Sequence, residues 1–222
     1  MKEVIDKYWM LKLNECKNAL EKNNFEAYVT ETSEEAKRLV FDKIIPNSGA
    51  KKISHGGSLT VDTLEILDLI RKNPEFEVIE ALAFPTNDRK EKMERARHAL
   101  IVDLFITGTN AVTETGILVN LDMWGNRVGA MAYGPRNVLI IAGRNKLVPN
   151  LSDAMDRIKS YAAPANAIRH DMKHPRKTPC VATGKCIECN GEWRICNTWV
   201  INEKSFPKGR IIVVLINEDL GL

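Results

Sequence analysis

Apolar residues in the first half of the chain recur at two spacings. Segments with apolar positions every three to four residues, which is typical of helices, run through residues 1–23, 33–45, 61–72 and 87–100. Short apolar runs typical of strands lie between them, at residues 25–29, 51–55 and 75–82. Strands that alternate with helices predict a parallel sheet covered by helices.

The pattern changes after Asp103. Four apolar runs follow with little room for helices between them, at residues 103–108, 116–121, 127–134 and 137–143. A helix is predicted over residues 150–169 and a last buried strand over 209–216. The prediction is a single α/β domain over residues 1–222, with a mostly parallel sheet flanked by helices and a β-meander in the second half. Its N-terminal helical part covers residues 1–45, and a cysteine-rich segment covers residues 175–208.

Composition and charge exclude several classes of protein. The net charge of +3 is spread along 222 residues and no basic block is interleaved with aromatic residues, so nucleic acid is not an expected partner. No segment approaches the ~20 apolar residues that span a bilayer, and the charged N-terminus lacks the apolar core of a signal peptide. We therefore expect no membrane partner, a cytoplasmic protein and reduced thiols.

Four of the five cysteines fall between residues 180 and 196. Cys180, Cys186, Cys189 and Cys196 are separated by five, two and six residues. In a reducing compartment this density favours a metal site over disulfides, with free thiols as the alternative. The overall spacing matches neither the usual two-cluster ferredoxin run nor a familiar zinc finger, and spacing alone does not separate zinc from a four-iron cluster. Cys16 lies in an amphipathic helix and is expected to be a buried apolar residue.

Two loops after predicted strands carry residues suited to an anion. The stretch SHGGSLT places Gly56, Gly57 and Ser58 between a strand and a helix, where the backbone can approach a ligand closely. The stretch AGRNKLVPN presents Arg144, Asn145 and Lys146 after another strand. The alternatives are a plain turn for the first loop and a solvated loop for the second. His55, beside the first loop, is more often structural than catalytic.

A third stretch, TGTNAVTETG, places one acidic residue between two apolar runs. Its polar side chains include Thr109, Asn110 and Thr113, and Glu114 stands two positions before Gly116. A carboxylate in this position is either a satisfied turn residue or a reactive group.

Taken together, DLFITGTNAVTETGILVNLD, GNRVGAMAYGPRNVLIIAGRNKLV and YAAPANAIR resemble the LUD domain of lactate utilisation proteins. The cysteine segment is similar to that of a short, stand-alone branch of this family. The resemblance implies the NagB/RpiA/CoA-transferase-like fold and a role in oxidising L-lactate to pyruvate alongside iron–sulfur partner proteins. CoA transferases of that fold group place a nucleophilic glutamate before Asn-Gly, whereas Glu114 here precedes Thr-Gly. The resemblance therefore implies that Glu114 is a polar contact or acid/base residue of the site, with a nucleophile as the alternative.

The expected function is the binding of a small anionic substrate in a crevice formed by Gly56–Ser58, Asn110–Gly116 and Arg144–Lys146. The cofactor would be zinc or an iron–sulfur cluster on the four clustered cysteines, and no nucleotide cofactor is expected. One alternative is a non-enzymatic binding or assembly subunit with a structural zinc tail. Another is an acyl-CoA or phosphosugar enzyme of the wider fold group. Assembly into a homo-oligomer stays open.

Overall fold

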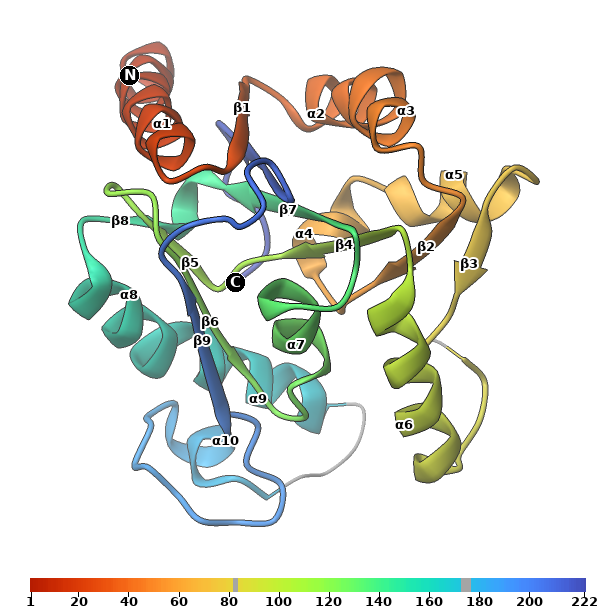
Figure 1. Cartoon of the computed structure of the whole chain (residues 1–222). Coiled ribbons are helices and arrows are strands. Elements are labelled where there is room, and N and C mark those ends of the chain that lie inside the picture. The colour runs from red at the N-terminus through yellow and green to blue at the C-terminus, as the bar shows by residue number, and fades with distance from the viewer. Residues whose placement is uncertain (82–83, 173–176) are drawn as a thin grey trace.

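A six-stranded parallel sheet forms the centre of the computed structural model, which describes residues 1–81, 84–172 and 177–222. All neighbouring strands in this sheet run in the same direction (Figure 1). The strand order is β1 (Glu26–Thr30), β10 (Ile211–Ile216), β7 (Asn137–Gly143), β4 (Leu104–Gly108), β2 (Lys52–His55) and β3 (Glu77–Ile79).

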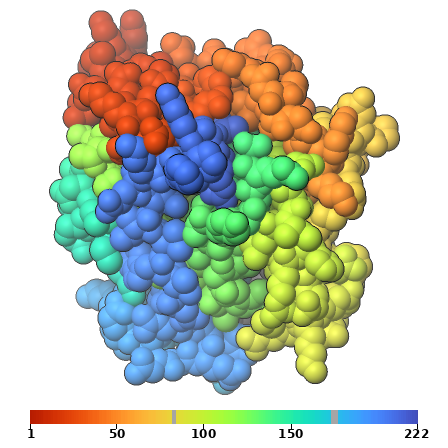
Figure 2. All heavy atoms as spheres, viewed as in Figure 1, coloured from red at the N-terminus to blue at the C-terminus, as the bar shows by residue number. Residues whose placement is uncertain are grey.

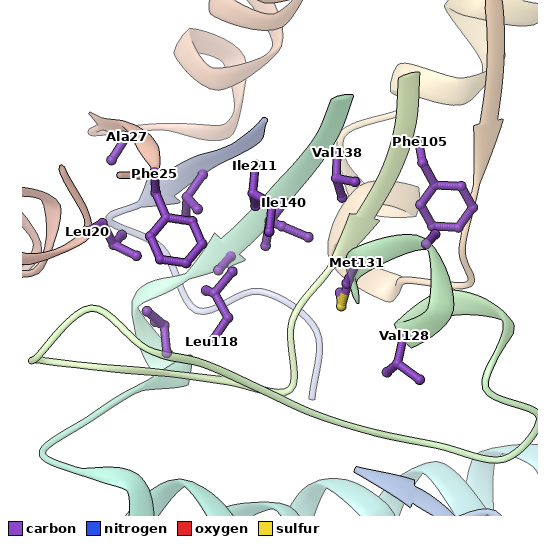
Figure 3. Close-up of a cluster of buried hydrophobic side chains, with 14 of the residues drawn as sticks. Leu20, Phe25, Ala27, Phe105, Leu118, Val128, Met131, Val138, Ile140 and Ile211 are labelled. Carbon is purple, nitrogen blue, oxygen red and sulfur yellow. The ribbon is translucent and has the colours of Figure 1, made fainter. Parts of the chain in front are cut away.

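Both faces of the sheet are buried, which explains why its central strands are apolar throughout. On β10, Ile211, Val213 and Leu215 belong to one core cluster, together with residues of α1 (Lys2–Lys22) and α7 (Asn126–Ala132). Figure 3 shows Leu20, Leu118 and Met131 gathered on this face.

The alternate β10 residues Ile212, Val214 and Ile216 belong to the second cluster. The helices on that face are α2 (Ser33–Leu39), α3 (Ile45–Ser48), α4 (Leu59–Thr63) and α5 (Ile66–Lys72), with a π-helical turn over Val40–Ile44 between α2 and α3. Alternate residues therefore pack on opposite faces, as the period of a strand requires.

A smaller sheet extends from the carboxyl end of β4. Its order is β8 (Leu147–Val148), β5 (Ala111–Thr113), β6 (Leu118–Asp122) and β9 (Thr198–Asn202). The pairs β5–β6 and β6–β9 are antiparallel, and β5–β8 is parallel. The helices after β8 are α8 (Leu151–Arg157) and α9 (Ala163–Asp171), joined by a π-helical turn over Ile158–Ala162. Only Thr109 and Asn110 separate β4 from β5, so the chain passes from one sheet to the other at these residues.

The α/β class and the mostly parallel sheet are confirmed, but one predicted strand is wrong. Residues 127–134 were expected to continue the meander, and residues 126–132 form helix α7. The stretch contains two alanines, a methionine and an arginine, which favour helices, and its buried residues, such as Val128 and Met131, pack on the main sheet. The Asp122 carboxylate also accepts a hydrogen bond from the Arg127 backbone N–H at 3.2 Å in the first turn.

Smaller differences concern the boundaries of elements. The predicted helix over residues 61–72 is divided into α4 and α5 at Glu65, whose φ is +54°. Strands β5, β8 and β9 and the short helix α10 (Pro179–Thr183) were not predicted. Leu82, at the end of the predicted strand 75–82, and residues 175 and 176 of the cysteine-rich segment lie outside the described residues. Within the described ranges, no helix has the length and apolar character needed to cross a bilayer.

Candidate functional site

A cavity of about 520 Å³ opens at the carboxyl edge of the parallel sheet. Gly57 and Ser58 follow β2, Gly108 ends β4, Thr109 comes next, and Lys146 follows β7. These residues meet because β4 lies between β2 and β7 and all three strands point the same way. Ligands of open α/β sheets bind in the crevice beyond this edge.

Positive charge predominates in the described lining of this cavity. Among the described lining residues, the cationic side chains are Arg89, Lys92, Arg127, Lys146 and Arg169, and the single acidic side chain is Asp122. Arg89 and Lys92 come from α6 (Arg89–His98), whereas Arg169 comes from α9. Elements distant in the sequence therefore direct positive charge at one space. This arrangement is suited to an anion.

Arg127 is the centre of a hydrogen-bond network in the cavity wall. Its guanidinium donates to Asp122 Oδ1 at 3.0 Å, to Asn120 Oδ1 at 2.8 Å and to Asn110 Oδ1 at 2.8 Å. It also donates to the backbone carbonyls of Gly108 and Leu121, at 3.2 and 3.3 Å. These five bonds use the donors of the guanidinium. Arg127 therefore fixes the β4–β5 crossing and contributes its charge to the cavity without a donor to spare for a ligand.

Lys146 is the most deeply buried cation of the site, with 5% of its surface exposed. Its Nζ donates to Thr60 Oγ1 at 2.8 Å, and no carboxylate of the described residues forms an ion pair with it. Burial, together with the charges of Arg157 and Arg127, lowers the pKa of Lys146 to about 7. Near neutral pH, the ammonium form and the neutral amine form of Lys146 are therefore both populated.

The glycines of the β2 loop serve two different purposes. A Cβ on Gly56 would lie 2.8 Å from Thr107 Oγ1 and 2.9 Å from Arg127 Cγ, so Gly56 is needed for packing. A Cβ on Gly57 would meet nothing within 4 Å, so its backbone borders open space in the cavity. Ser58 caps α4, with its Oγ accepting from the Val61 backbone N–H at 3.3 Å.

Glu114 does not line this cavity. Its carboxylate pairs with Lys12 of α1, with Oε1 at 3.3 Å from Nζ, and 39% of the side chain is exposed. The turn faces α1 because Gly116, at φ +79°, packs against the backbone of that helix. Thr113 lies in the same turn and accepts from the Ile117 backbone N–H at 3.0 Å. Of the residues expected in the crevice, Gly57, Ser58, Thr109, Asn110 and Lys146 line this cavity, and the Thr113–Gly116 turn lies outside its lining. A chemical role for Glu114 stays a prediction.

The other predicted residues outside the cavity lining hold neighbouring segments in place. Arg144 pairs with Asp6 at 2.8 Å and with Asp219 at 3.2 Å. Asn145 accepts from the Leu220 backbone N–H at 3.1 Å. They connect the end of β7 to α1 and to the C-terminal residues, although their neighbour Lys146 turns into the cavity.

His55 and Cys16 are also held by structural contacts. His55 lies 2.9 Å from Glu80, whose pKa is lowered to about 2 by His55 and Arg71. Cys16 is fully buried, as expected, and burial raises its pKa to about 12.

All four clustered cysteines line a second, small cavity of about 20 Å³. Each is a free thiol. Burial raises the pKa of Cys196, while Lys159 and Arg194 oppose that shift. In residues 1–81, 84–172 and 177–222, no three His, Cys, Asp or Glu side chains are already arranged to hold a metal ion.

The cysteine segment also borders the large cavity. Ile195 lines both spaces, and Trp193 lines the large one. Figure 2 shows this segment, in light blue, and α6, in yellow-green, on either side of α7 on one face of the molecule. The two candidate sites are therefore neighbours.

Sequence reasoning missed several residues of the cavity. Arg127 was hidden because residues 127–134 were interpreted as a strand. Arg89 and Lys92 stand in a helix with many charges, most of which face solvent, and Arg169 stands near the end of another helix. One signal was available: Asn126 and Arg127 follow Gly125, three residues after the end of an apolar strand.

The fold and this cavity define a ligand-binding α/β protein with a cationic site at the carboxyl edge of its sheet. The sequence profile of the LUD domain matches residues 13–216. The chain therefore belongs to the LUD domain family, which is associated with lactate utilisation.

A solved structure supports the same fold. This chain is similar to the crystal structure of a DUF162 family protein from Deinococcus radiodurans, with a TM-score of 0.52 and 12% sequence identity. The similarity covers 94% of this chain and 98% of the other. A comparison with curated proteins finds no match.

Proposed function

We propose that this protein binds a small organic acid of lactate metabolism, as its anion, in the cavity at the carboxyl edge of the sheet. The observation that carries the proposal is the excess of cationic over acidic side chains in the cavity lining. The side chains of Arg89 and Lys92 form no hydrogen bond or ion pair with the described residues, so their donors are available to a carboxylate. Family membership directs the choice of acid toward lactate and its 2-oxo product, pyruvate.

Calorimetric titration with lactate, pyruvate and lactamide tests this proposal. Lactamide keeps the size and hydroxyl of lactate but lacks its charge. Both acids should bind, and lactamide should bind at least about 10-fold more weakly, because a hydrogen bond to a charged group contributes roughly 1.5–3 kcal/mol. Equal binding of lactate and lactamide, or no binding of either acid, would overturn the proposal.

Two arginine variants provide a matched comparison. Arg169→Met removes a cation from the cavity. Arg136→Met removes a cation from the surface: 82% of the Arg136 side chain is exposed, and it forms an ion pair with Asp103. Arg169→Met should weaken lactate binding by about 10- to 100-fold, whereas Arg136→Met should leave it unchanged. Equal effects of the two variants would show that overall charge, rather than this site, controls binding.

The volume of the cavity favours a second candidate ligand. Pockets of 300–1,000 Å³ commonly enclose ligands much larger than a three-carbon acid, and this one is about 520 Å³. A phosphosugar or an acyl-CoA would use the same cations and more of the space. Parallel titrations with ribose 5-phosphate and acetyl-CoA distinguish these ligands from lactate, since binding of either one in place of the acids would select the second candidate.

We also propose that the cysteine segment binds a metal through Cys180, Cys186, Cys189 and Cys196. The supporting observation is that the four thiols surround one small space. A volume of about 20 Å³ accommodates one ion, because a single water needs roughly 10–15 Å³. An iron–sulfur cluster would require the segment to open. The metal would brace the segment or, as a cluster, accept electrons released by oxidation of the acid and pass them to an iron–sulfur partner protein.

Metal analysis of protein purified without oxygen tests this second proposal. About one zinc per chain in a colourless protein indicates a structural ion, and iron with sulfide in a brown protein indicates a cluster. Replacing Cys186 and Cys189 with serine should abolish metal retention, whereas Cys16→Ser should preserve it in the folded protein. A chain that binds neither metal would refute the proposal.

A further inference from the structure

Lys146 has features that a simple charge partner for an anion does not require. It lines the large cavity, 95% of its surface is buried, and it comes from the turn directly after β7. A cation that only holds a carboxylate can lie near the surface, as Lys92 does in the same cavity. Removing an ammonium group from water is costly when no carboxylate compensates for it.

The hydrogen bonds around Lys146 direct its nitrogen lone pair. Thr60 Oγ1 lies 3.2 Å from the Leu220 carbonyl, which can only accept, so the Thr60 hydroxyl donates there. The same oxygen then accepts from Lys146 Nζ at 2.8 Å. An N–H of Lys146 is therefore engaged with Thr60, and none of the described residues donates a hydrogen bond to the lone pair of the neutral amine.

The charged groups around Lys146 favour the neutral amine. Arg127 of α7 and Arg157 of α8 both disfavour the ammonium form, and burial disfavours it further. At pH 7 an amine with a pKa of about 7 is half neutral, whereas an ordinary lysine is neutral in only about one molecule in several thousand.

We infer that Lys146 is an amine nucleophile that captures the carbonyl group of a 2-oxo acid as an imine. The inference rests on the proposed function, because the cations of the cavity must hold the carboxylate of that acid. In the reaction, the nitrogen adds to C2 of the acid to form a carbinolamine. The carbinolamine oxygen then leaves as water, and a C=N bond replaces the C=O bond with no oxidant or reductant.

Reductive trapping tests the inference on the intact wild-type protein. The folded chain is incubated with pyruvate and sodium cyanoborohydride at neutral pH, and the modified lysine is located by peptide mass mapping. Lys146 should be modified at least about 100-fold faster than exposed lysines such as Lys52, which has 54% of its side chain exposed. Excess lactate, which has no carbonyl group at C2, should protect Lys146 without forming an adduct.

Two controls keep the outcomes separate. In protein unfolded by urea, the preference for Lys146 should disappear, because the buried environment is lost. Pyruvate binding is measured in parallel by calorimetry without reductant. Binding of pyruvate without modification of Lys146 would overturn the inference and leave the proposed function standing. Modification of Lys146 without protection by lactate would support the nucleophile and contradict the proposed ligand. Neither binding nor modification would overturn both.

Discussion

Substituting Gly116 measures whether the Thr113–Gly116 turn serves the fold or a ligand. An alanine Cβ at this position would lie 2.7 Å from Ala19 C and 2.7 Å from Leu20 N, both in the backbone of α1. The residue also has φ +79°, which L side chains rarely adopt. Gly49 provides the matched control, since it has φ +61° and nothing within 4 Å of the same Cβ position.

The structure gives the expected magnitudes. Gly49→Ala should lose about 1 kcal/mol of unfolding free energy, the lower end of the cost of a left-handed alanine. Gly116→Ala carries that cost and must also displace α1, and overpacking typically costs another ~1–3 kcal/mol. We therefore expect Gly116→Ala to lose about 3 kcal/mol in total.

Urea unfolding followed by circular dichroism measures both variants against the wild type. Equal losses for the two alanine variants would show that the contact with α1 does not constrain Gly116. Lactate titration of the folded Gly116→Ala protein completes the test. Binding should be retained, because the turn lies outside the cavity. Lost binding with unchanged stability would assign the turn to the site and contradict the reasoning.

Three further predictions concern charged residues. Arg127→Met should weaken lactate binding and cost about 3–5 kcal/mol of stability in urea unfolding, because it leaves Asp122, with only 13% of its side chain exposed, without its cation; a loss below ~1 kcal/mol would contradict the network's role. Because the folded-state pKa of Lys146 is lowered from 10.5 to about 7, the unfolded chain binds more protons between these values. Wild-type stability should therefore rise relative to Lys146→Met as pH increases from about 7 to 10.5; a constant difference would show that the lysine is not perturbed. Glu114→Gln should change stability by less than about 1 kcal/mol, since its pair with Lys12 is partly exposed, and lactate affinity should not change; a large loss of affinity or turnover would restore Glu114 to the site.

Much of the framework of the site could be predicted from the sequence. Apolar runs such as residues 137–143 show which strands are buried on both faces, and alternation with helices makes those strands parallel. The direction of a parallel strand then determines that Gly57 and Lys146 leave the sheet at the same edge. These properties depend on local spacing, which a single sequence contains.

The tertiary structure alone decided which of these loops share a cavity. Strand order places β4 between β2 and β7, so Lys146 meets Ser58, whereas the turn at Glu114 belongs to the second sheet and faces α1. Arg127 reaches the cavity from α7 and Arg169 from α9, and the charge pattern around Arg169 gives no sign of its place in the site. Local spacing fixes the direction in which a side chain leaves its own element, but long-range packing determines which other elements it meets. The charge of this cavity and the burial of Lys146 are therefore properties of the folded chain.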